Sequence, residues 1–365
     1  MDICTVLRSE ILDGKYDGAS RFPSEPSLAR RFEVSRSTIT RVLATLKQDG
    51  LIVSRKGSGS KVRFEKLGGS RCIGILVPGP ESSSFYAGIV KGAVEKCREL
   101  GYEPLIRRVT AADGKMEQRR GASAVASEFI RNHVDGVLLC PFSATPNDFD
   151  VNVIILDALQ NEGITVQLVN RPVGGAKGET CDLVWIDNVD AGRRVAAHLI
   201  DMGVRRCIFL CCPDVESVRM RYIGLTTEFT EIRKSAVWQI KRPPVSDRTV
   251  KGWMQRFKPQ AIVCGNDYYA YMLLTTLSRI GVAVPDEIMV SGFDDVRYEE
   301  RPICGLTTIS QPLVDIGMTA ISRLVERIRS HSLPRCSITL DAPLIVRAST
   351  TSEKFRSRKR KKERD

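Results

Sequence analysis

The spacing of apolar residues divides the first 65 positions into three helices and a hairpin. Apolar side chains recur every four positions over residues 2–13, which predicts an amphipathic helix. Ser24 and Ser35 each precede a further segment with helical spacing, and serine is a favoured N-cap. Apolar and polar residues then alternate over 51–54 and 60–64, as they do in paired strands. Three helices followed by a hairpin predict an α+β winged helix-turn-helix.

From residue 72 onwards, strands alternate with helices. Continuous apolar runs, typical of buried parallel strands, occupy residues 72–77, 136–140, 165–169, 207–211, 261–264 and 288–291. Helices that end at a glycine lie between them, for example 191–202 and 269–280. This alternation predicts doubly wound parallel sheets of the α/β class. Because the strands fall into two clusters, about 72–185 and 186–310, we expect two lobes with a ligand cleft beyond the carboxyl ends of the strands.

These patterns predict a multidomain chain whose parts have definable limits. They are a winged helix-turn-helix domain at 1–65, a linker at 66–71 that contains two glycines, a two-lobed domain at 72–350 and a basic tail at 351–365. The tail is charged and low in complexity, which is typical of a solvated segment. It is also a candidate for nonspecific attraction to DNA.

The positive charge is concentrated at the two ends of the chain. The formal net charge is +12, and residues 1–66 and 353–365 each carry +5. The large middle section is therefore nearly neutral. A basic N-terminal domain beside a nearly neutral body favours a polyanion as the partner of that domain.

Composition argues against an enzyme and against a membrane protein. The 11 cysteines include no CxxC pair, and the three histidines are widely spaced, so we expect no metal, no cofactor and no catalytic site. Most of the cysteines are expected to be buried small hydrophobes in a reducing compartment. No apolar run approaches the roughly 20 residues that span a bilayer, and the N-terminus lacks a secretory apolar core. We therefore expect a cytoplasmic protein.

The start of the third predicted helix carries the candidate chemistry for nucleic acid. Small hydroxyl residues and an arginine at a helix N-terminus suit contacts with phosphates and base edges. Arg36 is the candidate for a two-bond contact to a guanine edge, worth about 1–3 kcal/mol of discrimination. Lys56, in the predicted hairpin turn, is the candidate for a phosphate contact. The alternatives are that Ser35 is only a helix cap and Arg36 only a surface charge.

The N-terminal domain contains short motifs at fixed spacing: Phe22-Pro23-Ser24-Glu25, Leu28-Ala29, Val34-Ser35-Arg36, Gly50-Leu51-Ile52 and Gly57-Ser58-Gly59. In this set it resembles the GntR-type DNA-binding domain, in which a recognition helix enters the major groove and the wing reaches the minor groove. The resemblance implies DNA contacts from Ser35, Arg36, Ser37, Thr38, Thr40, Arg41, Lys56 and Gly57. The chain departs from the family at Pro26 and Thr40, where relatives often carry arginine.

The body contains the segments IGILVPGPESSSFYAGIVKGAVEKCRELGY, VDGVLL, WIDNVDAGRRVAAHLIDMGVRRCIFL, RMRYIGL, AIVCGND, GVAVPDEIMVSGFDDV and GLTTISQPLVDIGMTA. In this order they resemble the effector-binding domain of LacI/GalR regulators, which shares the fold of periplasmic sugar-binding proteins. A GntR-type head on such a body resembles the arabinose-responsive repressors of Gram-positive bacteria. The DNA-proximal hinge helix of LacI members is replaced here by the Gly-Gly linker.

The second resemblance implies a set of ligand-binding residues: Phe85, Asn170, Arg221, Asn266 and Asp294. Their aromatic, amide, guanidinium and carboxylate groups suit the ring and hydroxyls of a neutral or acidic sugar. The alternatives are that Asp294 caps a helix and that Phe85 belongs to the core, whereas Asp267 is expected to support the fold. The chain departs from the family in a shortened segment at 224–241 and a longer one at 111–124.

The sequence therefore predicts a DNA-binding transcription regulator, more precisely a dimeric repressor that binds a palindromic operator and responds to a small molecule. One alternative is a regulator with a degenerate cleft, in which the body serves only dimerisation. A second alternative is an enzyme with a pyridoxal-phosphate-binding body, but such a body would need a longer chain and a Schiff-base lysine in its usual setting. A third is a transport-binding protein, but such a protein would need export, and the N-terminus is predicted to bind DNA. The effector, the operator sequence and the sign of regulation do not follow from the sequence.

Overall fold

The computed structural model describes residues 3–12, 16, 22–48, 51–55, 59–62, 70–79, 83–109, 115–142, 149–174, 176–212, 215–232, 234–241, 243, 246–296, 305–330 and 333–352. The predicted wing contacts Lys56 and Gly57, the two linker glycines and the tail from 353 onwards lie outside these residues.

The N-terminal domain has the predicted three helices and a hairpin: α1 (Ile3–Leu12), α2 (Glu25–Phe32), α3 (Arg36–Gln48), β1 (Ile52–Arg55) and β2 (Gly59–Val62). The strands pair antiparallel, with Ile52 opposite Val62. One side of each helix supplies a common core, which includes Leu7, Leu28 and Leu46, each with no exposed surface. The winged helix-turn-helix prediction is confirmed.

The first lobe of the body contains a six-stranded, wholly parallel sheet in the order β13-β7-β6-β5-β3-β4. Its strands are β3 (Cys72–Pro78), β4 (Glu103–Val109), β5 (Gly136–Leu139), β6 (Thr165–Val169), β7 (Asp182–Ile186) and β13 (Ser337–Leu340). Its helices are α4 (Ser83–Glu99), α5 (Lys115–Arg131), α6 (Phe149–Asn161) and α7 (Ala176–Glu179). The sequence predicts that residues 111–124 form a longer segment than in relatives. From residue 115 onwards this segment belongs to α5.

The second lobe contains the sheet β14-β12-β11-β10-β8-β9, which is parallel except at β14. Its strands are β8 (Arg206–Leu210), β9 (Ala236–Ile240), β10 (Ala261–Cys264), β11 (Met289–Asp294), β12 (Thr307–Ser310) and β14 (Leu344–Ile345). Its helices are α8 (Asn188–Asp201), α9 (Glu216–Thr230), α10 (Asp247–Phe257) and α11 (Asp267–Arg279), followed near the end by a 3-10 turn at Ala348–Thr350.

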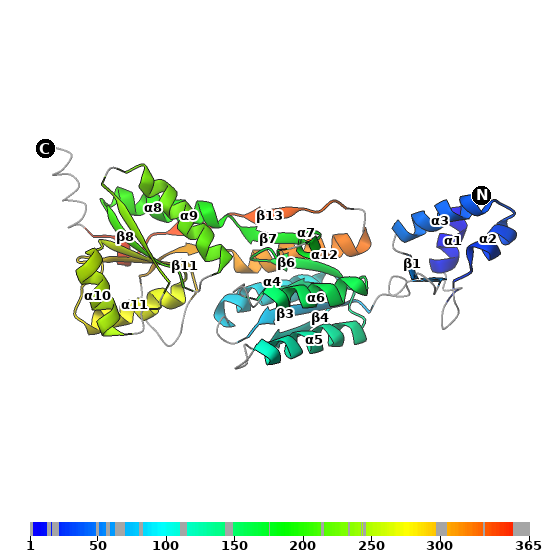
Figure 1. Cartoon of the computed structure of the whole chain (residues 1–365), viewed down its shortest axis with the longest axis horizontal. Coiled ribbons are helices and arrows are strands. Elements are labelled where there is room, and N and C mark those ends of the chain that lie inside the picture. The colour runs from blue at the N-terminus through cyan, green and yellow to red at the C-terminus, as the bar shows by residue number, and fades with distance from the viewer. Residues whose placement is uncertain are drawn as a thin grey trace.

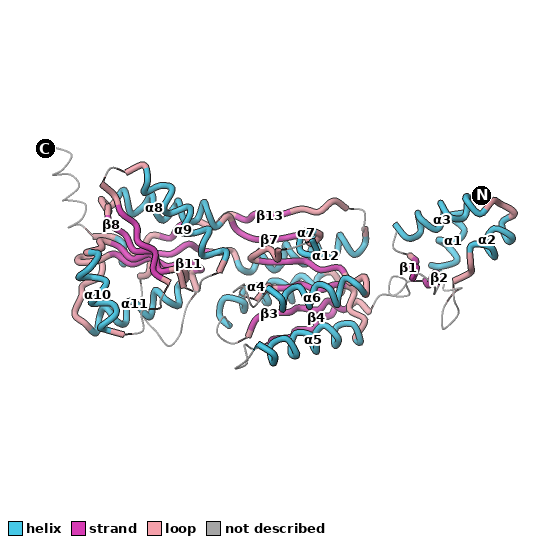
Figure 2. The backbone as a smooth tube through the Cα atoms, viewed as in Figure 1, coloured by secondary structure: helices cyan, strands magenta, loops and turns pink. Residues whose placement is uncertain are grey.

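The chain passes between the lobes three times, which the division at residue 186 did not anticipate. It leaves the first lobe after β7, returns at α12 (Leu313–Arg329) and β13, and crosses again to β14. Figure 1 shows α12 and β13, orange to red, lying with the green and cyan elements of the first lobe. Figure 2 shows the two separate groups of strands that result. One apolar core extends through both lobes, so the crossovers join them into one body.

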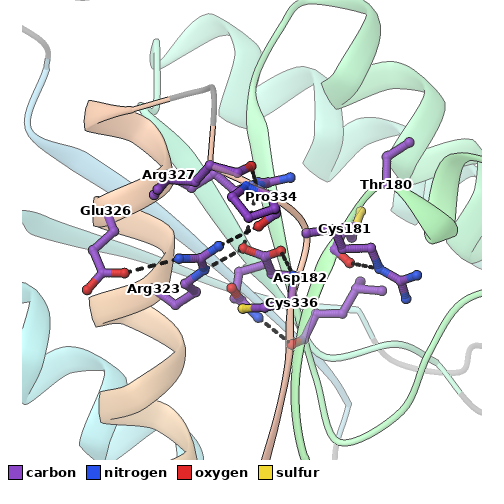
Figure 3. Close-up of polar contacts among 12 residues, drawn as sticks. Thr180, Cys181, Asp182, Arg323, Glu326, Arg327, Pro334 and Cys336 are labelled. Carbon is purple, nitrogen blue, oxygen red and sulfur yellow. Dashed lines mark hydrogen bonds and ion pairs between the residues drawn. The ribbon is translucent and has the colours of Figure 1, made fainter.

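A buried carboxylate fastens the returning segment to the first sheet (Figure 3). Asp182, at the start of β7, is 1% exposed and accepts hydrogen bonds from Arg323 Nε at 2.7 Å and from the Cys336 backbone N–H at 2.8 Å. Arg323 also donates to the Pro334 carbonyl at 2.8 Å. The groups of α12, of β7 and of the segment just before β13 together satisfy this buried ion pair.

The described residues contain neither a membrane-spanning helix nor a group of metal ligands. None of the described helices is long and apolar enough to cross a membrane. Within the same residues, no group of three or more His, Cys, Asp or Glu side chains could hold a metal ion. Seven of the ten cysteines that the structure describes are buried, as expected of small hydrophobes.

Candidate functional sites

The helix α3 has one buried face and one exposed polar face. Ile39, Leu43 and Leu46 face the domain core. Of the predicted DNA contacts on this helix and its cap, Thr38 is half-buried and Ser35, Arg36, Ser37, Thr40 and Arg41 are exposed. A helix that is apolar on one side and carries hydroxyls and cations on the other can lie in the major groove while its core face stays packed.

The cap at Ser35 is made as predicted. Its side-chain oxygen accepts a hydrogen bond from the Thr38 backbone N–H at 3.2 Å and lies 2.8 Å from the hydroxyls of both Ser37 and Thr38. Thr40 donates its hydroxyl to the Arg36 carbonyl at 2.9 Å. Within the described part of the chain, the Arg36 guanidinium has no partner, so its five donors stay available for phosphate or base.

An ion pair that the sequence did not reveal orients α2 against α1. Arg31 Nη1 donates to Glu10 at 2.7 Å and to the Tyr16 hydroxyl at 2.9 Å, and that hydroxyl donates to Glu10 at 2.6 Å. The Arg31 guanidinium also lies 4.7 Å from the centre of the Phe32 ring. This cluster engages one arginine of the basic domain in a contact between helices.

In the body, Arg221 on α9 is held by groups from three other elements. It is 3% exposed, and its Nε donates to Asn188 Oδ1 at 2.8 Å while Nη1 donates to the Gly265 carbonyl at 2.7 Å. The same Nη1 lies 3.5 Å from Asp294 Oδ1, and the guanidinium lies 4.7 Å from the centre of the Phe293 ring. Burial lowers the Arg221 pKa, and the neighbouring Asp294 carboxylate opposes that effect.

Two glycines allow the helix that carries Arg221 to pack directly on α8. A Cβ at Gly224 would lie 1.9 Å from the Val189 carbonyl oxygen, and a Cβ at Gly192 would lie 2.1 Å from the Arg221 carbonyl oxygen. Both distances are far below van der Waals contact. Only glycine therefore permits the helix spacing that brings Arg221 to Asn188.

Asp294 ends β11 in a backbone conformation that favours glycine, with φ of 113°. It is 7% exposed and accepts a hydrogen bond from Gln311 Nε2 at 2.6 Å. Burial raises its pKa to about 6, although the Arg221 cation opposes the rise. The neighbouring Asp295 pairs instead with Arg347 at 2.8 Å. The Asp294 carboxylate thus lies between the amide of Gln311 and the guanidinium of Arg221.

The other predicted ligand-binding residues have different surroundings. Asn266 is the N-cap of α11, where its Oδ1 accepts from the Tyr269 backbone N–H at 3.1 Å. Asn170 is buried directly after β6 with φ of 72°. Phe85 is half-buried and packs edge-on against Tyr86, with ring centres 5.2 Å apart.

Asp267 has the supporting role expected of it. It is 1% exposed, and its two oxygens accept from the Thr308 hydroxyl at 2.7 Å and the Val296 backbone N–H at 3.0 Å. Burial raises its pKa well above the ordinary value, and the charge of Asp294 adds to the rise. It ties β11 and β12 to α11.

The buried polar residues around Arg221 and Asp294 include three that the sequence did not single out: Arg171, Asn188 and Gln311. Together with Arg221 and Asp294 they form what we call the inter-lobe cluster, and each of the five is at most 7% exposed. Arg171, Asn188 and Gln311 each follow a strand, β6, β7 and β12 respectively. Their position at carboxyl strand ends is the signal that could have found them.

Comparison with known sequences identifies both parts of the chain. Residues 2–62 match bacterial regulatory proteins of the gntR family, and residues 196–350 match the periplasmic binding protein-like domain. The arabinose metabolism transcriptional repressor of Geobacillus stearothermophilus is 28% identical over 358 residues, which cover 94% of this chain and 95% of that protein.

Two solved structures share the fold. A LacI family transcriptional regulator from Enterococcus faecalis V583, with bound ribose, has a TM-score of 0.63 at 21% identity and covers 77% of this chain and 98% of its own. The complex of the transcriptional regulator CelR with cellobiose has a TM-score of 0.62 at 21% identity and covers 90% of this chain and 100% of its own.

The fold, the exposed face of α3 and these matches define the class: a DNA-binding transcription regulator with an effector domain. Within this class, the chain combines a winged helix-turn-helix that matches the gntR family with a body that matches the periplasmic binding protein-like domain.

Proposed function

We propose that the chain is a repressor that binds a palindromic operator as a dimer through α3 and is controlled by a small polyhydroxylated effector bound between the lobes. We also propose that the DNA-binding domain ends at residue 65, that the body begins at residue 72 and that the predicted contact residues bind DNA and effector. Arg36 and its hydroxyl neighbours would position α3 in the major groove, with Lys56 and Gly57 at the wing.

The observation that carries the effector claim is the Arg221–Asp294 pair. A buried guanidinium and a buried, strained carboxylate 3.5 Å apart, at carboxyl strand ends, offer donors and acceptors to vicinal hydroxyls. Ribose and cellobiose bound in structural relatives support a carbohydrate. The rest of the effector site would be lined by Asn170 and Phe85 from the first lobe and by Asn266 from the second.

Effector binding that favours one arrangement of the lobes would change the distance between the two winged helix-turn-helix domains of a dimer. Coupling of this kind is typically worth about 1–3 kcal/mol, or about 5–150-fold in affinity. Because a Gly-Gly linker stands between head and body, the coupling would depend on the positions of the two linker starts rather than on a rigid hinge helix.

The experiment is fluorescence anisotropy of the full-length chain on its own promoter DNA, with and without arabinose, ribose and cellobiose. Arg36→Ala should abolish specific binding, whereas Lys47→Ala, which removes the same charge from the exposed far end of α3, should weaken binding only slightly. Specific binding by the Arg36 variant would refute the groove assignment. If no compound changes operator affinity or thermal stability while the dimer persists, the body is a dimerisation module.

A further inference from the structure

The outward face of α9 carries no charged side chain over three turns. Its residues are Met220, Ile223, Thr226, Thr227 and Thr230, of which Met220 and Thr226 are half-buried and the other three exposed. Ile223 is 54% exposed, more than any other large apolar side chain in the described part of the chain. A helix on the surface of a protein normally presents charges to water, as α10 does with several exposed cations. This face of α9 therefore has the composition of a contact surface.

The threonine hydroxyls on this face are already bonded within the helix. Thr226 donates to the Tyr222 carbonyl at 2.9 Å. Thr227 donates to the Ile223 carbonyl at 2.9 Å, and Thr230 donates to the Thr227 carbonyl at 2.6 Å. Because covering these side chains would leave no hydroxyl without a partner, the face can lose its water at little cost.

The spacing along this face is that of a seam between two helices. Met220, Ile223, Thr227 and Thr230 follow one another at alternating intervals of three and four positions. Side chains at this spacing pack into the grooves of a second helix that lies nearly along the first. In an antiparallel pair centred on residue 225, Ile223 comes level with Thr227 of the partner helix, and Met220 comes level with Thr230. The seam therefore matches a second copy of itself.

The charges at the two ends of the seam favour the same arrangement. Arg219 at one end and Glu231 at the other are both exposed, and both are six positions from residue 225. The antiparallel pair brings Arg219 of each helix level with Glu231 of the other, whereas a parallel pair would bring like charges together. The opposite side of α9 already packs on α8 at Gly224, so the second helix has to come from another copy of the chain.

The size of the seam indicates how strong the contact is. α9 has 15 residues and is therefore about 22 Å long. A single pair of such helices buries less than the roughly 1,200 Å² of a stable interface. The contact is therefore too weak to hold the dimer itself, but it forms where copies are held close together, as on neighbouring DNA sites.

We propose that α9 is a self-association surface through which two dimers join, its outward face packed antiparallel on the α9 of a second copy. The existence of the dimers and the consequence for DNA rest on the proposed function, whereas the seam itself does not. Its three threonines lie in the segment 224–241, in which the sequence is predicted to depart from relatives. The seam would let two dimers bound at separate operators hold each other.

The test is sedimentation equilibrium of the full-length chain over a range of concentrations. The natural chain should form tetramers from dimers with a dissociation constant on the order of 10 µM, as small interfaces do. Ile223→Glu places a charge in the seam and should weaken this step at least about 10-fold, whereas Ile223→Leu should preserve it. The matched control is Val346→Glu next to β14, at an apolar residue that is 45% exposed, and it should have no effect.

Charge reversal tests the antiparallel register. Arg219→Glu and Glu231→Arg each bring like charges together and should weaken the tetramer about 3- to 10-fold, and both changes in one chain should restore it. A double variant that assembles no better than the single ones would overturn the register. All these side chains are exposed, so the variants should melt like the natural chain. If Ile223→Glu nonetheless fails to fold, the charge-reversal series decides the outcome.

DNA fragments with one and with two operator copies measure the consequence for DNA binding. On one copy, Ile223→Glu should bind as tightly as the natural chain. On two copies, the natural chain should bind cooperatively, and Ile223→Glu should lose that cooperativity.

The inference is overturned if the natural chain remains a dimer at every concentration, or if Ile223→Glu and Val346→Glu assemble alike. Dissociation of Ile223→Glu into monomers would place the seam inside the dimer and would also overturn it. A chain that binds operator but never forms tetramers contradicts this inference and leaves the proposed function standing. A chain that forms tetramers through α9 but binds no operator does the opposite.

Discussion

The exposed polar face of α3, which we propose as the DNA-binding face, and the inter-lobe cluster use arginine in opposite ways. Arg36 is exposed on α3 and, within the described residues, has no partner, so it keeps its full set of donors for DNA. Arg221 is 3% exposed and already bonded to an amide, a carbonyl and a carboxylate. Side chains on an exposed face can be replaced without harm to the fold, whereas the stability of a buried cluster depends on every one of its side chains. The two regions should therefore respond very differently to the same substitution.

The largest difference is expected for arginine-to-alanine changes at these two positions. Arg221→Ala leaves Asp294 buried without its cation and should destabilise the body by about 3–5 kcal/mol. Arg36→Ala should change stability by less than about 0.5 kcal/mol. Urea unfolding of both variants measures this. Equal stabilities would mean that the buried pair contributes nothing to the fold.

The next largest effect concerns the helix contact that positions Arg221. Gly224→Ala places a methyl group 1.9 Å from the Val189 carbonyl and should cost about 2–3 kcal/mol as α9 moves away from α8. The control is Gly252→Ala on α10, where no atom lies within 4 Å and alanine should stabilise by about 0.5–1 kcal/mol. Calorimetric melting distinguishes the two. A Gly224 variant that melts like the natural chain would show that the helices can separate freely.

The buried carboxylate predicts a dependence on pH that the exposed face should lack. Asp294 binds its proton more tightly in the folded chain, where its pKa is about 6, than in the unfolded chain near 3.8. Its contribution to stability is therefore full below about pH 4 and is lost as the pH rises through about 6, a difference of about 3 kcal/mol at most. Asp294→Asn should remove this dependence. Parallel pH profiles of the two proteins would contradict the assignment.

The smallest effect separates two roles of Asn266, the cap of α11 and the predicted ligand contact. Asn266→Ala loses the cap and should cost about 1 kcal/mol, whereas Asn266→Asp keeps a capping oxygen and should cost almost nothing. The aspartate lacks the amide donors, so effector affinity should fall in both variants. If the aspartate variant binds the effector normally, Asn266 is a cap alone.

The comparison also explains what the sequence could reveal. The helices of the head follow from local periodicity, since Ser35 caps the helix that it precedes and Leu46 lies on the same face as Ile39. The strand ends of the body likewise follow from the apolar runs that lead up to Asn170 and Asp294. These features depend on neighbours within a few residues, which a sequence pattern records directly.

Pairings between distant segments could not be predicted. The amphipathic pattern of α12 does not say which sheet the helix covers, so its return to the first lobe was missed. The partners of Arg221 lie far away along the chain. It donates hydrogen bonds to Asn188 and Gly265, which are 33 and 44 residues away, and it forms an ion pair with Asp294. Arg171 stands next to a predicted residue, yet only the packed structure shows that its Nε and Nη1 have no partner among the described residues.

The central claim is that the inter-lobe cluster and the DNA-binding face are energetically coupled. The most direct measurement is calorimetric titration of the effector into the full-length chain, alone and saturated with operator DNA. Linkage requires the effector affinity to change by the same factor, about 5–150-fold, by which the effector changes operator affinity. An identical effector affinity with and without operator would contradict the account.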